Sequence, residues 1–268
     1  MTPRCIRAVT CVLALVPVGV APYAAAGEPV ADEPPWFRHI AARSWLQNYD
    51  PTLISDRVFV EASYEDRAGG ASRFKIDHSL RLAFPLGEGT AFGIQVLVPV
   101  VWDHADGDTR GIGDGELRVG VVRRHSDSVR FGFGLNGLFD TATDRELGGG
   151  ALVLRPILAM RWDANERLNL GINVEYSFTP RDEGSGDVRA LELKLPFATK
   201  FTDRWSGSLT YKRRWDFEAD DRRHRAEAGA SFSWGGVRQY ALNFGAELPF
   251  SEDVLNWKLT AGVAWYFH

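Results

Sequence analysis

The C-terminal segment NWKLTAGVAWYFH, residues 256–268, alternates apolar and polar side chains. Its odd-numbered positions from Trp257 to Phe267 are apolar, and its even-numbered positions include Lys258 and Thr260. A period of two is typical of a β-strand with one apolar face. In a soluble protein such an apolar face packs on other elements of the same chain. The pattern of the remaining segments therefore shows whether the chain has elements that could cover this face.

The same pattern repeats along the chain from about residue 53 onward. Segments of roughly ten residues alternate apolar and polar positions, and breaks rich in Gly, Asp, Asn or Pro separate them. The predicted strands are 56–65, 72–84, 90–102, 115–125, 129–140, 151–162, 167–178, 188–198, 205–217, 223–234, 237–250 and 256–267. An even number of strands, with breaks that alternate between long and tight, is typical of bacterial membrane barrels.

Aromatic residues mark both ends of the apolar face of nearly every predicted strand. Those expected near the tight turns are Phe84, Phe92, Phe131, Trp162, Trp205, Trp234, Tyr240, Trp265 and Phe267. Those expected near the long loops are Tyr64, Trp102, Phe139, Tyr176, Phe178, Trp215, Phe250 and Trp257. An aliphatic band between two aromatic belts fits a bilayer with two headgroup layers. The sequence therefore predicts an all-β fold, an antiparallel transmembrane β-barrel of about twelve strands that closes on itself.

The polar face of the predicted strands carries many ionic side chains, which would line the inside of the barrel. A dry core could not hold them, because each unpaired ion costs several kcal/mol. Two interpretations remain open: a wet lumen with positive walls that favours anionic or polar aromatic solutes, and a lattice of paired Arg and Glu that nearly fills it. The candidate lumen-lining residues are Glu61, Arg73, Arg118, Arg124, Arg155, Arg161, Lys212, Arg214 and Arg225.

The N-terminal residues have the pattern of a secretory signal peptide. Two arginines precede an apolar run at 8–21, and an A-x-A arrangement ends at Ala26, so residues 1–26 are expected to be removed. Both cysteines, Cys5 and Cys11, would leave with this segment, which excludes disulfides and thiolate chemistry in the mature chain. An exported chain of this pattern is expected in a Gram-negative outer membrane.

Residues 27–51 are expected to form a periplasmic N-terminal segment that precedes the barrel at 52–268. Within it, PPWFRHIAARSWLQ at 34–47 is a helical candidate, because proline stands at its start and apolar residues follow at helical spacing. Such a helix could plug the barrel or lie against its periplasmic rim, and a loosely ordered leader is the alternative.

The sequence contains no pattern that indicates catalysis, a metal or a cofactor. Its six histidines lack metal-site spacing, and its formal net charge of -4 gives no reason to expect nucleic acid. A membrane hydrolase would need a serine beside a histidine on one face, but His78 is expected to face lipid and Ser79 the interior. The G-x-G-x-G in GIGDGELRVGVVRR at 111–124 leads into a strand, so it lacks the helix N-terminus that binds phosphate.

The middle of the chain resembles the MetA-pathway of phenol degradation family of outer-membrane proteins. The motifs that carry the resemblance are the G-x-G-D at 111–114, the Gly-rich strand VRFGFGLNGLFDTATD at 129–144, the glycines at 148–150 and LGINVEYSF at 170–178. The resemblance implies an outer-membrane barrel that passes hydrophobic or aromatic compounds inward, and it transfers no site residues. Where the family has G-D and an aliphatic residue, this chain has Asp114-Gly115-Glu116, which adds a charge at the lumen mouth.

The features together predict an outer-membrane β-barrel that acts as a passive channel or facilitator for small solutes, with aromatic or anionic compounds as candidates. The alternative is a structural or surface-interaction barrel with a filled, non-conducting lumen. The expected partners are the lipid bilayer, the solutes, and the outer-membrane assembly machinery, which would recognise the C-terminal strand. That signal usually ends on the aromatic residue, so His268 after Phe267 is a small departure.

Overall fold

The structure, a computed structural model, describes residues 55–87, 89–105, 108–180, 188–234, 240–250 and 255–267. The predicted signal peptide at 1–26 and the helical candidate at 34–47 lie outside the described residues. In the part of the chain that is described there is no α-helix, and no helix there is long and apolar enough to cross a membrane.

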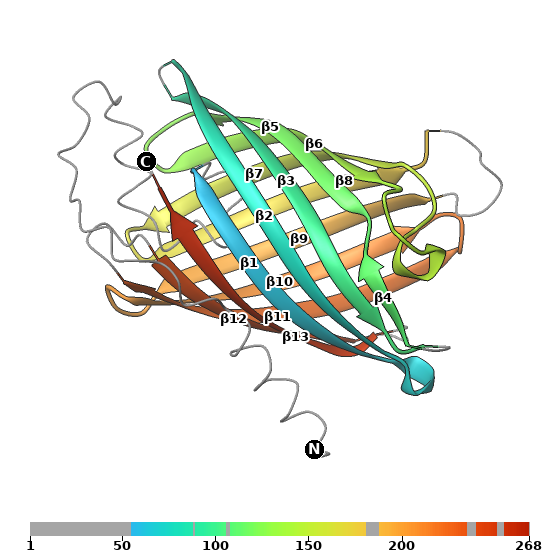
Figure 1. Cartoon of the computed structure of the whole chain (residues 1–268). Helices are drawn as coiled ribbons and strands as arrows, with labels where there is room; N and C mark the ends of the chain where they lie inside the picture. The colour runs from blue at the N-terminus through green and yellow to red at the C-terminus, as the bar shows by residue number, and fades with distance from the viewer. Residues whose placement is uncertain are drawn as a thin grey trace. The chain divides into compact units, whose positions relative to one another are not determined.

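The described residues form one antiparallel sheet that closes on itself (Figure 1). The strands are β1 (Arg57–Arg67), β2 (Ser72–Gly87), β3 (Thr90–Asp103), β4 (Thr109–Ile112), β5 (Gly115–Arg124), β6 (Val129–Phe139), β7 (Val153–Asn165), β8 (Leu168–Phe178), β9 (Arg189–Lys200), β10 (Trp205–Asp216), β11 (Asp221–Trp234), β12 (Tyr240–Pro249) and β13 (Leu255–Tyr266). Each long strand pairs with its neighbours along the chain, and β1 also pairs with β13. The prediction of a closed barrel with twelve long strands is confirmed.

The closing pair β1–β13 shows how the last strand is used. Its register runs without a break from Arg57 opposite Tyr266 to Asp66 opposite Trp257. Closure gives every long strand a partner on both sides, so no backbone edge is left unpaired in a lipid environment. The alternating segment at the end of the chain is therefore half of the seam that turns a sheet into a barrel.

The outer face of the barrel is apolar, as predicted. Leu80, Phe133, Leu158, Leu209 and Leu248 expose between 43% and 61% of their surface. An apolar surface of this extent would be unfavourable in water, since each buried square ångström of apolar area is worth roughly 25 cal/mol. Lipid is the medium that this face fits.

Aromatic side chains gather at both ends of the outer face. We call the end where β1 joins β2 the long-loop rim and the opposite end the tight-turn rim. Tyr64 and Trp257 meet across β1 and β13 at the long-loop rim, with ring centroids 5.3 Å apart. Trp205 and Phe232 meet across β10 and β11 at the tight-turn rim, with centroids 4.9 Å apart. The predicted aromatic belts thus include pairs that bridge neighbouring strands, beside pairs within one strand such as Tyr176 and Phe178.

The segment predicted as a loop between residues 103 and 114 contains a strand. β4 pairs with the end of β3, from Val100 opposite Ile112 to Asp103 opposite Thr109. Because β5 pairs with the same edge of β3, β4 and β5 are one strand interrupted at Gly113 and Asp114. Four residues are too few to show a period of two, which is why the alternation does not predict this strand.

Candidate functional site

The inner face of the barrel carries the ionic side chains. The nine predicted lumen-lining residues all occupy the strand face opposite to the exposed apolar side chains. They do not form one site. Glu61 and Lys212 line one cavity, Arg118 lines another, and the others lie elsewhere on the inner wall or near the rims.

The densest group of inward charges surrounds Lys212 on β10. Its Nζ lies 2.5 Å from Glu227 Oε2 and 2.7 Å from Glu247 Oε2, and Arg225 Nη1 lies 3.1 Å from Glu247 Oε1. The residues that line the cavity of about 210 Å³ at this point are Glu61, Lys212, Glu227, Gly245, Ala246, Glu247, Lys258 and Thr260. This part of the wall is a lattice of paired charges, as in the second of the two interpretations.

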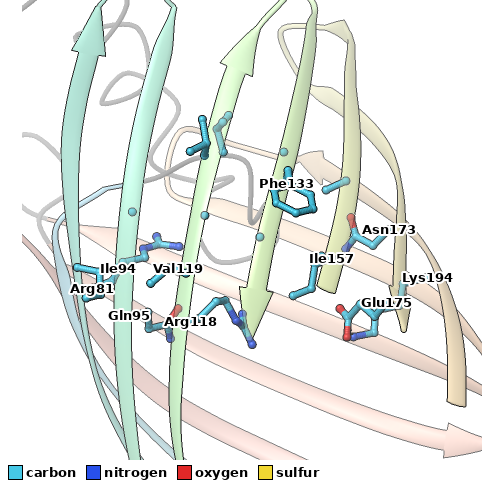
Figure 2. Close-up of a pocket in the computed structure, with 17 residues that line it drawn as sticks. Arg81, Ile94, Gln95, Arg118, Val119, Phe133, Ile157, Asn173, Glu175 and Lys194 are labelled. Atoms are coloured by element: carbon cyan, nitrogen blue, oxygen red, sulfur yellow. The ribbon is translucent and has the colours of Figure 1, made fainter. Parts of the chain in front are cut away.

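A second cavity, of about 240 Å³, lies along β2, β3 and β5–β9. Figure 2 shows its polar side chains in two groups, with Gln95 and Arg118 on one side and Glu175 and Lys194 on the other. The Arg118 guanidinium donates to Glu116 Oε1 at 2.7 Å, and Lys194 Nζ donates to Glu175 Oε1 at 2.7 Å. Arg118 keeps 40% of its side chain exposed, so its pair with Glu116 leaves part of the cation accessible.

Between these two polar groups the wall consists mainly of small residues, with Ile157 beside them (Figure 2). The small residues that line it are Gly93, Gly120, Gly132, Gly134 and Ala159. A Cβ built on Gly120 or Gly134 would contact only backbone atoms of the neighbouring strand. The small residues therefore leave a hollow over bare backbone, with charged groups at its ends.

Two further predicted arginines, Arg155 and Arg161, lie on the inner face of β7. Arg161 is only 1% exposed, and its Nη1 donates to Asn173 Oδ1 at 2.7 Å and to the Met160 carbonyl at 2.9 Å. Arg155 lies opposite Asn136 in the β6–β7 register, and among the described residues its Nε has no hydrogen-bond partner. Arg155 is thus a candidate for contact with solutes, and Arg161 is part of the wall.

The remaining predicted cations lie near the rims. Arg214 pairs with Asp216 at 3.3 Å near the long-loop rim. Arg124 lies 3.6 Å from Asp127 at the tight-turn rim, and the Asp127 side chain is 95% exposed. In all, at least six of the eight predicted cations have a described carboxylate within 4 Å, which neutralises much of the expected positive wall.

Two buried carboxylates on the inner face were not predicted. Asp163 accepts from Arg130 Nη1 at 2.7 Å and from Asn169 Nδ2 at 2.7 Å, and Asp103 accepts from Arg73 Nε at 2.5 Å. Both occupy the first inward-facing position beyond the predicted end of their strands. The predicted strands 90–102 and 151–162 end one residue too early to include them.

The loop between β6 and β7, residues 140–152, folds over the inner face near the long-loop rim. It contains the 3-10 turn η3 (Arg145–Leu147), and Leu147 is only 3% exposed. A Cβ at Gly111 would collide with Thr143 and Leu147, and one at Gly113 would collide with inward-facing Val101. The loop can pack this closely because Gly111 in β4 and Gly113 just after it present no side chain.

Asp114 holds this loop in place. Its carboxylate accepts from the Gly149 N–H at 2.6 Å and from the Ala142 N–H at 3.3 Å. Arg73 Nη2 donates to the Glu146 carbonyl at 3.2 Å, which ties the loop to β2. The aspartate of the G-x-G-D motif is therefore a loop anchor, and the added charge at Glu116 pairs with Arg118 instead.

The residues considered for other chemistry do not come together. Ser79 is buried on the inner face and His78 is exposed on the outer face, so they lie on opposite sides of the wall, as expected. Among the described residues, no group of three or more His, Cys, Asp or Glu side chains could hold a metal ion.

Solved structures with this architecture are outer-membrane proteins. The COG4313 outer membrane channel from Pseudomonas putida F1 superposes with a TM-score of 0.68 at 13% identity, over 80% of this chain and 96% of that one. The NanC porin gives 0.56 at 10% identity, over 78% and 100%. The CymD monoaromatic hydrocarbon channel gives 0.53 at 9% identity, over 84% and 93%. The fold is that of outer-membrane channel barrels.

Identities this low establish the fold and leave the function to the residues of this chain. A scan against protein-family models and a search of curated proteins found no match to the sequence. The resemblance to the MetA-pathway family therefore rests on the sequence motifs alone.

Proposed function

We propose that this protein is an outer-membrane channel through which small solutes diffuse passively. The observation that carries the proposal is the 240 Å³ cavity on the inner face of a closed barrel whose outer face fits lipid. The solved structures of the same fold are channels and porins by name, which agrees with this function. In this proposal residues 1–26 direct export and are removed, and the barrel spans the outer membrane with the long-loop rim outward.

The lining of the cavity suggests the class of solute. A bare-backbone hollow accommodates a flat apolar group, and an apolar cavity of about 150 Å³ is large enough for benzene. Arg118 at one end of the hollow can attract a carboxylate, since guanidinium groups bind carboxylates through two parallel hydrogen bonds. Small aromatic anions therefore fit this wall best, in line with the MetA-pathway resemblance.

Uptake by liposomes tests the channel function. Liposomes that contain the refolded protein should swell with small aromatic acids and, more slowly, with neutral sugars of similar size. Protein-free liposomes and liposomes with heat-denatured protein serve as controls. If reconstituted protein gives neither swelling nor ion conductance in planar bilayers, the barrel is filled, and a structural or surface-interaction role replaces the channel.

Reversing two of the inward cations should change ion selectivity. The double variant Arg118→Glu, Arg155→Glu replaces two positive charges near the cavity with negative ones, so the preference for anions over cations should fall about tenfold or more. The reversal potential across a bilayer with a salt gradient measures this ratio. Arg204→Glu, an exposed residue in the turn after β9, is the matched control and should change it little. Equal reversal potentials for all three proteins would contradict the assignment of Arg118 and Arg155 to the path.

A further inference from the structure

A cluster of basic and aromatic side chains lies on the outer face of β10 and β11, near the long-loop rim. In the β10–β11 register Arg213 is opposite His224, and Trp215 is opposite Arg222. Directly opposed residues of antiparallel strands point to the same side. That side is the lipid-facing one, because Leu209 on the same face of β10 is 53% exposed. We call Tyr211, Arg213, Trp215, Arg222 and His224 the headgroup patch.

Contacts within the headgroup patch hold its side chains in place. The guanidinium carbon of Arg213 lies 4.6 Å from the centroid of the Trp215 ring. The Tyr211 hydroxyl lies 2.6 Å from His224 Nδ1. The aromatic rings belong to the belt where lipid headgroups meet hydrocarbon, and they orient the cations at that depth.

The counter-charges of these strands lie elsewhere. On the inner face, Arg214 pairs with Asp216 at 3.3 Å and Arg223 pairs with Asp221 at 2.5 Å. On the outer face, no described carboxylate lies within 4 Å of Arg213 or Arg222. Arg213 and Arg222 are diagonal neighbours in this register, and without acidic partners among the described residues their charge can be offset by an anion from the surroundings.

We propose that the headgroup patch binds the phosphate group of an anionic lipid in the outer leaflet. Arginine suits this ligand, because its planar fork donates two parallel hydrogen bonds to phosphate oxygens. Apolar side chains lie directly toward the membrane centre for the acyl chains, with Leu195 opposite Tyr211 and Leu209 two residues along β10. From the rim toward the membrane centre, the cations come first and the apolar side chains second. A lipid has the same order of charged headgroup and acyl chains.

Native mass spectrometry of the full chain in detergent tests the proposal with diphosphoryl lipid A as the probe. The wild-type barrel should retain lipid A, and an uncharged glycolipid of similar acyl length should bind much more weakly. Each surface arginine contributes about 1 kcal/mol toward anionic lipid, so the variant Arg213→Gln, Arg222→Gln should bind lipid A about thirtyfold more weakly. Arg123→Gln is the matched control, since Arg123 is an exposed arginine on the outer face of β5 at the opposite rim.

Further variants keep the result decisive. The double variant Arg213→Lys, Arg222→Lys retains the positive charges but loses the planar guanidinium groups that donate two parallel hydrogen bonds. Its affinity for lipid A should lie between those of the wild type and the glutamine variant. If the double glutamine variant does not refold, Arg222→Gln alone should weaken binding about fivefold. Unchanged lipid A binding in the glutamine variants, an equal loss in Arg123→Gln, or equal binding of the uncharged glycolipid would overturn the proposal. Solute conductance should not change in these variants, so a failure here is distinct from a failure of the channel function.

Discussion

Replacing Asp163 with asparagine is expected to lower the free energy of unfolding of the barrel by about 3 kcal/mol, because removing one partner of a buried ion pair leaves the other charge in a poorly solvated place. The Arg130 and Asp163 side chains are only 7% and 4% exposed. The Asp163 carboxylate faces two Arg130 nitrogens, at 2.7 and 3.3 Å, and an amide replacement cannot offset that charge. Unfolding in urea, followed by tryptophan fluorescence in lipid vesicles, measures the difference.

Asp127→Asn is the matched control for this prediction. Asp127 also faces an arginine, Arg124, but at 3.6 Å and with its own side chain 95% exposed. Ion pairs of this kind contribute about 0–1 kcal/mol, so this variant should unfold almost as the wild type does. A similar loss of unfolding free energy in both variants would show that burial does not determine the strength of these ion pairs.

Replacing Asp114 with alanine is expected to release the 140–152 loop from the inner face and to raise the single-channel conductance. Hydrogen bonds to a charged carboxylate contribute about 1.5–3 kcal/mol each, so the loss of the bonds to Ala142 and Gly149 should destabilise the folded loop by about 3 kcal/mol or more. Single-channel recordings measure the conductance. Limited proteolysis of the long-loop side of proteoliposomes measures the release of the loop.

Asp144→Ala provides a control within the same loop. The Asp144 carboxylate accepts from the Glu146 N–H at 3.0 Å and has no hydrogen bond or ion pair to another element among the described residues, so its loss removes only a local cap worth about 1 kcal/mol. Conductance and proteolysis should stay close to those of the wild type. If Asp114→Ala also behaves as the wild type does, the position of the loop on the inner face does not depend on this anchor.

The sequence predicts the strands to within a few residues, because a period of two is a local property that each strand carries by itself. The errors follow from the same fact. β4 is too short to show a period, and Asp103 and Asp163 were missed because charged residues at strand ends look like the start of a turn. Asp114 was noted only as the aspartate of the G-x-G-D motif, and its anchor role was not predicted, since its partners Ala142 and Gly149 offer backbone N–H groups that no side-chain pattern reveals.

The sequence by itself determined which face of each strand meets lipid and that the sheet must close, because both follow from alternation and from the lack of water in the bilayer core. The tertiary structure decided which charges meet. Lys212 contacts Glu227 and Glu247 only because the tilt and stagger of β10–β12 bring these positions to one level of the barrel. Stagger is a property of the closed sheet, and no single strand encodes it.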